Sequence, residues 1–326
     1  MKLFISKDIP LPAIDLLTES GFDISINESG SRLSPQQLIM ACKHADYLLN
    51  VGQGQLDADF FEACAHLKGI ALTSVGYDHV DLNAATAASI PISNTPDVLS
   101  DATADIAFLL MLAVSRKAFF RAMQVRDGAW TDFEFTKHLG VELQGKTLGI
   151  FGLGRIGLSL ARKAKAAYGM KIIYHNRHRN PQAEEAVEAT YVNFDDLLRH
   201  SDVLSVHTNL TAETAHRFNK DSFRRMKNSA IFINTARGRI HHEPDLIEAL
   251  QKKEIWGAGL DVTDPEPMLP DNPLLNMANA CIFPHIGSAT LETRTKMALL
   301  AAKNLIAVKN GQKMPQVINE DVYNKR

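Results

Sequence analysis

The sequence predicts an α/β protein of two domains, each built around a parallel β-sheet. The chain has 326 residues, which is enough for two hydrophobic cores. Short apolar runs alternate with amphipathic runs of helical spacing along almost the whole chain, and a glycine-rich turn separates one such strand from its helix near the middle. This alternation is typical of parallel strands joined by helical crossovers that cover the sheet.

The first 100 residues contain five apolar runs that we expect to be strands, separated by four amphipathic helices. The helices are expected at residues 13–20, 35–44, 58–66 and 82–88. Three of them carry a start signal, because Ser34, Asp57 and Asp81 each place an N-cap oxygen directly before the helix. The first domain therefore begins with a βα series.

Three later segments depart from this rhythm. Residues 100–117 predict a long helix with apolar side chains all round, so we expect it to pack between two domains or subunits. Residues 127–143 lack periodicity, contain Trp130 and predict an extended arm. A final helix at 292–310 is long enough to cross back to the first domain. We therefore expect one domain from residues 1–100 and 288–326, and a second from residues 101–287.

A strand, a glycine turn and a helix follow one another in the middle of the chain. Residues 146–151 form a short, mostly apolar run, and the sequence GLGRIG follows at 152–157. In residues 158–168 the apolar side chains recur at helical spacing. In this context the glycines permit a tight turn, close approach of a pyrophosphate and close helix packing, and the helix start binds the phosphate charge. The alternative is an α/β turn without a ligand. We predict a Rossmann-type, doubly wound domain that binds a dinucleotide.

The composition argues against several kinds of partner. With 35 basic and 37 acidic side chains, the chain lacks the concentrated positive charge that nucleic acid or an acidic membrane surface would need. Cys42, Cys64 and Cys281 are too few for a disulfide framework or a Cys-x-x-Cys metal site, and we expect them to be buried. No secretory signal is recognisable, and the longest apolar run, 106–114, is too short to cross a bilayer. We expect a cytoplasmic enzyme.

The second βα series continues with strand patterns that end in polar motifs. We expect helices at 195–199 and 245–251, between the apolar runs. Three motifs follow the last strands: INTARG at 233–238, GLDV at 259–262 leading to Glu266, and PHIGSAT at 284–290. Ligands gather at the carboxyl ends of strands in open α/β sheets, so we expect a site there.

Together with GLGRIG, these motifs resemble those of the D-isomer-specific 2-hydroxyacid dehydrogenases. SVGYD at 74–78 and TPDVL at 95–99 extend the resemblance to nearly the whole chain. Within the family, Trp130 and PHIGSATLETR are most similar to the glyoxylate/hydroxypyruvate reductases and the 2-ketogluconate reductases. The resemblance implies a Rossmann cofactor domain, a flavodoxin-like substrate domain and a homodimer joined through the cofactor domain. It also implies reduction of small 2-keto acids by hydride transfer from NAD(P)H in a cleft between the domains.

The resemblance makes Arg237, Glu266 and His285 the catalytic set. The chemistry agrees, because a 2-keto acid needs a cation for its carboxylate and carbonyl and a proton for the nascent alkoxide. Arginine binds carboxylates through two nitrogens, histidine transfers protons near neutral pH, and a nearby glutamate favours the imidazolium. Each residue also has a simpler interpretation as a solvated charge, a turn residue or a hydrogen-bonded loop histidine.

The resemblance implies further contacts. Asp261 is expected to bind the nicotinamide carboxamide and Thr103 to contact the cofactor near the hinge. Cofactor contacts are expected at Thr103, Gly152, Gly154, Arg155, Ile156, Gly157, Asn176, Arg177, Arg179, Asn209, Thr235, Asp261 and Gly287. Substrate contacts are expected at Val51, Gly52, Val75, Gly76, Arg237, Ser288 and Trp130, the tryptophan being one that a partner subunit could supply.

The charge pattern after the next strand bears on cofactor choice. An NAD site usually has an acid about 20 residues past the glycines, whereas this chain has Asn176-Arg177-His178-Arg179. A 2'-phosphate would be attracted by Arg177 and Arg179, so we predict a preference for NADPH over NADH. The alternative is a solvated basic turn on an enzyme that uses NADH.

Some positions depart from the family pattern. Thr208-Asn209-Leu210 stands where proline usually precedes leucine, Thr263 replaces an aromatic residue, and His241-His242 stands where Val-Asp is usual. His242 would be a poor cap at a helix start, and two adjacent histidines without a third ligand do not predict a metal site.

Two alternatives remain open at this point. One is a 2-ketogluconate reductase or another NADH-linked D-2-hydroxyacid dehydrogenase, which a panel of keto acids would distinguish. The other is a nucleotide-sensing protein like the family's corepressors. Such a protein would fail to consume NADPH whichever 2-keto acid is offered.

Overall fold

The computed structural model describes residues 1–52 and 54–324, and the chain divides into two compact units. Unit 1 consists of Met1–Leu99 and Ala289–Arg326, and unit 2 of Ser100–Ser288. Each unit contains one parallel sheet, as the sequence predicts for an α/β protein of two domains. Among the residues described, no helix is long and apolar enough to span a membrane.

Unit 1 is built on a five-stranded sheet with the order β2-β1-β3-β4-β5. All four strand pairs are parallel. This order is that of flavodoxin-like folds, as predicted. The strands are β1 (Lys2–Ile5), β2 (Asp23–Ile26), β3 (Tyr47–Asn50), β4 (Gly69–Leu72) and β5 (Ile92–Ser93).

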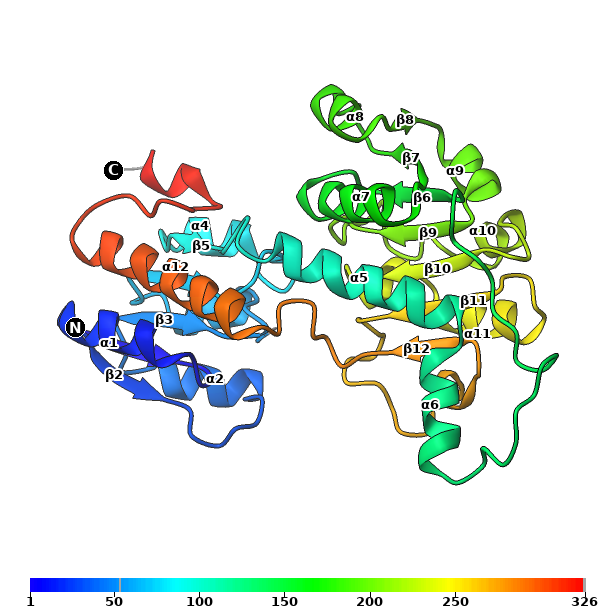
Figure 1. The fold of residues 1–326 in the computed structure, drawn as a ribbon. Helices are drawn as coiled ribbons and strands as arrows, with labels where there is room; N and C mark the ends of the chain where they lie inside the picture. Colours follow the sequence, from blue (N-terminus) through cyan, green and yellow to red (C-terminus); the bar gives the residue numbers. More distant parts are fainter. Residues whose placement is uncertain (53, 325–326) are drawn as a thin grey trace. The chain divides into compact units, whose positions relative to one another are not determined.

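Helices cover both faces of this sheet (Figure 1). One face packs on α1 (Leu11–Glu19) and α12 (Leu291–Lys309), the other on α2 (Pro35–Cys42), α3 (Ala58–Ala63) and α4 (Leu82–Ala87). The expected N-caps are confirmed, because the side chains of Ser34, Asp57 and Asp81 accept backbone N–H bonds at the starts of α2, α3 and α4. The last helix, α12, packs on α1 and β4, so the carboxyl-terminal segment completes this unit, and η3 (Glu320–Tyr323) follows it.

Unit 2 is built on a seven-stranded parallel sheet with the order β12-β11-β10-β9-β6-β7-β8. Its first six strands in the chain reproduce the Rossmann order 3-2-1-4-5-6, and β12 extends the edge. The strands are β6 (Thr147–Phe151), β7 (Lys171–His175), β8 (Thr190–Tyr191), β9 (Val203–Val206), β10 (Ile231–Asn234), β11 (Gly257–Leu260) and β12 (Ala280–Ile282).

Two helical layers enclose this second sheet. One contains α5 (Ser100–Ser115), α7 (Arg155–Tyr168) and α8 (Pro181–Val187), and the other α9 (Phe194–His200), α10 (Lys220–Arg225) and α11 (Glu243–Gln251). Within its own unit, α5 packs on α7, β10 and β11. The sequence did not predict α6 (Ala118–Arg126), α8 or α10. The first buries no residue. The other two have 7 and 6 residues, but length alone does not explain why they were missed, because the predicted helices α3 and α4 have 6 residues each.

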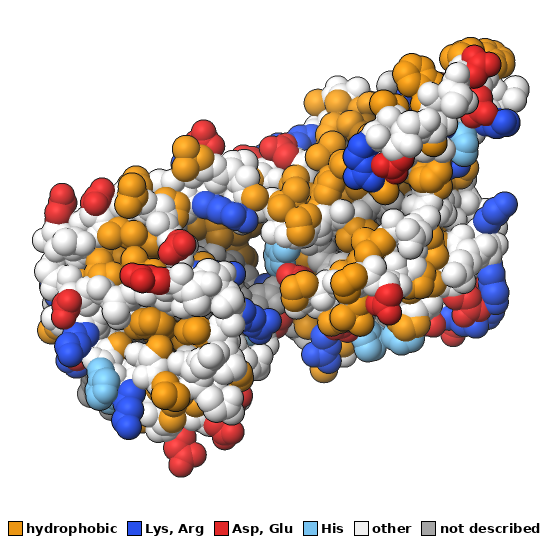
Figure 2. Space-filling model, turned by 90° about the horizontal axis from the view of Figure 1, so that it is seen from below, with side chains coloured by type: hydrophobic (Ala, Val, Ile, Leu, Met, Phe, Trp, Pro, Cys, Tyr) orange, Lys and Arg blue, Asp and Glu red, His pale blue; other side chains and the backbone are white. Residues whose placement is uncertain are grey.

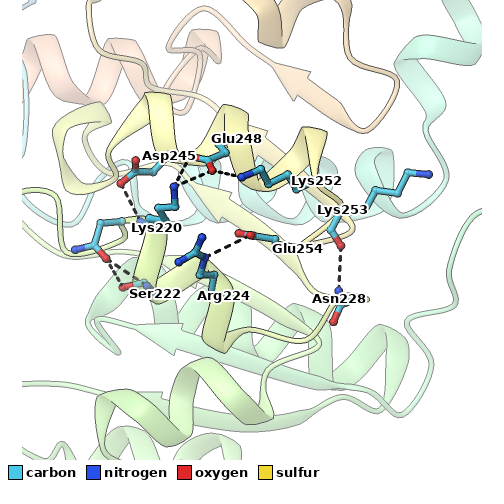
Figure 3. A network of polar contacts seen from close by, with 10 residues as sticks. Lys220, Ser222, Arg224, Asn228, Asp245, Glu248, Lys252, Lys253 and Glu254 are labelled. Atoms are coloured by element: carbon cyan, nitrogen blue, oxygen red, sulfur yellow. Dashed lines mark hydrogen bonds and ion pairs between the residues drawn. The ribbon is translucent and has the colours of Figure 1, made fainter.

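Ion pairs join α10 to α11 and to the segment that follows α11 (Figure 3). Lys220 Nζ lies 2.8 Å from Glu248 Oε1, which also pairs with Lys252, and Arg224 Nε lies 3.5 Å from Glu254 Oε1. These side chains are partly solvated, so water screens the pairs and they contribute little to stability. The face shown in Figure 2 has basic and acidic side chains interspersed rather than separated.

Residues 127–143 contain no helix or strand, consistent with the expected arm. The arm is rich in exposed apolar side chains, with Trp130 60%, Phe133 78% and Phe135 80% exposed. The three cysteines, Cys42, Cys64 and Cys281, are buried and reduced, as expected.

Candidate active site

The glycine turn has the geometry that dinucleotide binding requires. Gly152 has φ +103°, and a Cβ there would lie 2.5 Å from the carbonyl oxygen of His207. Gly154 is the N-cap of α7 and a Cβ would meet nothing within 4 Å, so a ligand can approach its backbone. At Gly157 a Cβ would lie 2.6 Å from the Gly152 oxygen, which fixes the close packing of helix and turn. Arg155 and Ile156 belong to the first turn of α7, whose unpaired N–H groups lie beside the glycine turn at the carboxyl end of β6.

Two asparagine side chains fix this turn from the segment after β7. Asn176 Oδ1 accepts the Leu153 N–H at 2.6 Å, and Asn180 Nδ2 donates to the Leu153 carbonyl at 3.1 Å. The structure therefore places Asn176 against the turn. Asn180 was missed by sequence reasoning, although Asn180 before Pro181 is the same helix-start signal as Ser34 before Pro35. Its contact with Leu153 is visible only in three dimensions.

The two arginines of the basic turn have different surroundings. Arg179 makes two hydrogen bonds to Glu184, at 3.0 and 2.6 Å, and lies over the ring of Tyr191. The guanidinium of Arg179 and the hydroxyl of Tyr174 lower the pKa of Glu184 to about 2. Arg177 lies two positions earlier and is exposed. The two arginines are therefore not equivalent, because the guanidinium of Arg179 is bound by a carboxylate of α8.

The turn after β10 holds Arg237. Asn234, fully buried at the end of the strand, accepts the Ala236 N–H at 2.9 Å and donates to the Arg237 carbonyl at 2.8 Å. Arg237 itself is half-buried, and its Nη1 donates to the Ala236 carbonyl at 2.7 Å. Thr235 is buried and its hydroxyl lies 3.4 Å from His207 Nδ1. Asn234 is a positioning residue that sequence reasoning missed, although it stands within the INTARG motif.

Glu266 and His285 form a direct pair. His285 Nδ1 lies 2.6 Å from Glu266 Oε1, with the two side chains 37% and 28% exposed. His285 has φ +54°, a left-handed conformation that is uncommon for residues other than glycine. The strands β10, β11 and β12 are adjacent and parallel, and each is followed by one residue of the catalytic set: Arg237, Glu266 and His285. All three residues therefore follow the carboxyl ends of neighbouring strands, on one side of the sheet.

Asp261 organises the segment that carries His285. Its two carboxylate oxygens accept the N–H groups of Ile286 and Gly287, both at 2.7 Å. The hydroxyl of Thr103 donates to the Gly287 carbonyl at 3.3 Å. Burial raises the pKa of Asp261, although these N–H groups and nearby His285 act in the opposite direction. The structure thus gathers three of the expected cofactor contacts, Thr103, Asp261 and Gly287, beside His285.

The remaining expected contacts are distributed over both units. In unit 1, Val51 donates its N–H to Ser6 Oγ at 2.8 Å, and Gly52 has φ +84°. The carbonyls of Val75 and Gly76 accept hydrogen bonds from Asn94 and Ser74, each at 2.8 Å. In unit 2, Asn209 is exposed in the loop after β9, its carbonyl accepting from Thr214 at 2.8 Å. Ser288 is half-buried directly after Gly287.

The histidine pair that departs from the family pattern has a structural explanation. His241 is fully buried, its Nδ1 lies 3.0 Å from Asn234 Nδ2, and burial lowers its pKa to about 3. His242 is the N-cap of α11 without a side-chain cap bond, as expected, and its Nδ1 lies 3.0 Å from Asp245 Oδ2. Across the described ranges, 1–52 and 54–324, no group of three or more potential ligands could hold a metal ion.

Comparison with known proteins identifies relatives along the whole chain. The family described as D-isomer specific 2-hydroxyacid dehydrogenase, NAD binding domain, matches residues 108–287. The glyoxylate reductase of Thermococcus litoralis is 43% identical over 325 residues, covering 98% of this chain and 97% of that protein. The glyoxylate reductase of Korarchaeum cryptofilum is 38% identical over 326 residues, covering 100% and 98%.

Solved structures agree with this assignment. The TT0316 protein of Thermus thermophilus is 40% identical with a TM-score of 0.91, covering 98% of this chain and 100% of that one. An NADPH-dependent glyoxylate/hydroxypyruvate reductase of Sinorhizobium meliloti, solved with NADP and malonate, is 31% identical with a TM-score of 0.85, covering 97% and 96%.

Proposed function

The chain belongs to the D-isomer-specific 2-hydroxyacid dehydrogenase family, and we propose that it reduces small 2-keto acids, glyoxylate and hydroxypyruvate among them, to D-2-hydroxy acids with NAD(P)H. The observation that carries the proposal is the 2.6 Å contact between His285 and Glu266. This pair lies at the sheet edge that also holds Arg237. Relatives named glyoxylate reductase along their full length support the substrate class.

The residues of the glycine turn fit a nicotinamide dinucleotide. The open space at Gly154 and the N–H groups at the start of α7 suit a pyrophosphate. Arg155, Ile156, Asn209, Thr235 and Gly287 would line the remainder of the cofactor, and Asp261 would accept from its carboxamide. When bound, the reduced nicotinamide supplies the hydride for the 2-keto carbon.

Arg237 and His285 divide the remaining chemistry between them. Arg237 binds the substrate carboxylate and stabilises the oxyanion that develops on the carbonyl. Because His285 Nδ1–H donates to Glu266, its Nε2 is the nitrogen that gives a proton to that oxygen. Glu266 keeps the ring oriented through this hydrogen bond.

We propose NADPH as the preferred cofactor. Arg177 is exposed after β7 at the position where NAD enzymes use an acid, and it would attract a 2'-phosphate. Arg179 would contribute less, because Glu184 already occupies its guanidinium. The S. meliloti relative is an NADPH-dependent enzyme solved with NADP, which supports the same preference here.

We further propose a homodimer, with substrate contacts from unit 1. Backbone N–H groups of Val75 and Gly76 would contact the substrate carboxylate, with Val51 and Gly52 on the same rim of the site. The exposed aromatic side chains of the arm, including Trp130, are suited to burial against a second copy of the chain. In that arrangement Trp130 would contact the substrate bound in the site of the other subunit. Ser288 would contact the substrate in the site of its own subunit.

The test is the loss of nicotinamide absorbance with NADPH and NADH in parallel, against glyoxylate, hydroxypyruvate, pyruvate and 2-ketogluconate. The proposal expects the fastest consumption with NADPH and glyoxylate or hydroxypyruvate. Faster turnover of 2-ketogluconate would reassign the substrate, and no turnover with any keto acid would contradict the proposal.

A further inference from the structure

We infer that Glu243 is a positioning residue that holds the loop carrying Glu266 and thereby orients the Glu266–His285 pair. The inference deepens the proposed function and rests on it. The loop in question, residues 263–272, connects β11 to η2 (Pro273–Asn276) and is called the Glu266 loop below.

Glu243 contacts both ends of the Glu266 loop. It is the first residue of α11 and is only 7% exposed. Its Oε1 accepts from Asn272 Nδ2 at 2.6 Å, and its Oε2 accepts from the Asp264 N–H at 3.4 Å. A buried carboxylate is costly without donors, and the start of a helix favours its negative charge. The contacts thus tie the two loop ends to one fixed point.

That fixed point belongs to the segment that also carries Arg237. A Cβ at Gly238 would overlap the carbonyl of Thr263, so the backbone after Arg237 lies directly against the start of the Glu266 loop. The Thr263 hydroxyl donates to the Pro265 carbonyl at 2.8 Å, which shapes the same end. Backbone contact therefore holds Arg237 against the start of the Glu266 loop. Glu243 in addition holds both ends of that loop.

Glu266 itself depends on this support. Its side chain is 28% exposed, and the flanking residues Pro265 and Pro267 are exposed as well. A displacement of about 1 Å would break its 2.6 Å contact with His285, and misplacement of that size at a reacting group costs up to about 100-fold in rate. Glu243 acts through Glu266 and touches no reacting atom.

The test uses an exchange of donor and acceptor. Glu243→Gln keeps the shape but offers one acceptor to two donors, so one contact to the loop is lost. Adding Asn272→Asp restores the lost contact with donor and acceptor exchanged. The amide introduced at position 243 then donates to the carboxylate introduced at position 272, and its oxygen still accepts from the Asp264 N–H. Glu62→Gln, at an exposed glutamate of α3, is the control.

We expect Glu243→Gln to lower kcat about 10-fold or more, with the KM for NADPH changed less than about 2-fold, and the double variant to recover most of the loss. The downfield proton resonance of the His285 Nδ1–H, assigned by its loss in Glu266→Gln, should weaken in Glu243→Gln and return in the double variant. Melting temperatures confirm that all variants fold.

Two results would overturn the inference. One is an unchanged Nδ1–H resonance and an unchanged kcat in Glu243→Gln. The other is a loss that the double variant does not repair although it melts at the wild-type temperature. The resonance is observed without substrate, so the inference is tested even if the wild-type protein reduces no 2-keto acid, a result that would count against the proposed function alone.

Discussion

His285 Nδ1 lies 2.6 Å from Glu266 Oε1 across 19 positions of sequence, and the contact brings together two loops that follow adjacent parallel strands. Because Nδ1 is engaged by the carboxylate, the other ring nitrogen is the one available for proton transfer. Each residue alone has a simple structural interpretation. The pair, on the sheet edge that also carries Arg237, is what proton donation to a carbonyl requires.

Replacing Glu266 should impair proton delivery more than binding. In Glu266→Gln the imidazolium loses its carboxylate partner, so we expect kcat for glyoxylate reduction to fall about 10- to 100-fold. Steady-state rates at saturating NADPH and glyoxylate measure the effect. A kcat equal to that of the wild type would show that Glu266 does not support the proton donor.

Gly152→Ala should disrupt the cofactor turn. The residue has φ +103°, and the added Cβ would lie 2.5 Å from the His207 carbonyl, so we expect a loss of more than about 1 kcal/mol in stability and a large rise in the Kd for NADPH. Gly128→Ala is the matched control, since Gly128 has φ +70° but nothing within 4 Å of its Cβ position. Fluorescence titration with NADPH distinguishes the two variants. Equal Kd values would mean that the turn tolerates a side chain.

The two arginines after β7 should contribute unequally to cofactor choice. Arg177→Ala should raise the KM for NADPH about 10-fold or more and leave that for NADH nearly unchanged, because only NADPH has the 2'-phosphate. Arg179→Ala should have a smaller effect, since Glu184 holds that guanidinium at 2.6 Å. An equal loss for NADPH and NADH in Arg177→Ala would remove the basis for the preference.

His241 should make the protein less stable in acid. Burial lowers its pKa from 6.5 in the unfolded chain to about 3 in the fold. Between these values the unfolded state binds more protons, so the free energy of unfolding falls as the pH drops below 6.5, by about 1.4 kcal/mol per pH unit. In His241→Gln the stability lost between pH 7 and pH 5 should be smaller by about 2 kcal/mol, as measured by urea unfolding.

The sequence predicts much of this structure where a residue acts on its own neighbours. The helix caps at Ser34, Asp57 and Asp81 act locally, so they can be inferred from the sequence alone. The spacing of the three glycines likewise predicts the turn, but not the contact of Gly152 with His207 that excludes a side chain there. The same local signal precedes α8 and α10, which begin at the N-caps Asn180 and Asn219, although these two helices were not predicted.

Contacts between distant residues could not be inferred in the same way. Asn180 reaches across 27 positions to Leu153, and Glu243 reaches across 29 to Asn272. Such polar side chains have no signature in the sequence, because strand order and register alone bring their partners near. These side chains support the site from outside the motifs. Their contacts are therefore known only from the three-dimensional structure.

The most direct test of the account is the rate of NADPH oxidation with glyoxylate by the wild type and by His285→Asn. The wild type should consume NADPH, and the variant should lose about 100-fold or more in kcat, because general acid catalysis contributes about 10²- to 10⁴-fold. The Kd for NADPH should stay within about 2-fold, since His285 does not hold the phosphates. A variant that turns over glyoxylate at nearly the wild-type rate would contradict the assignment of His285 as the proton donor.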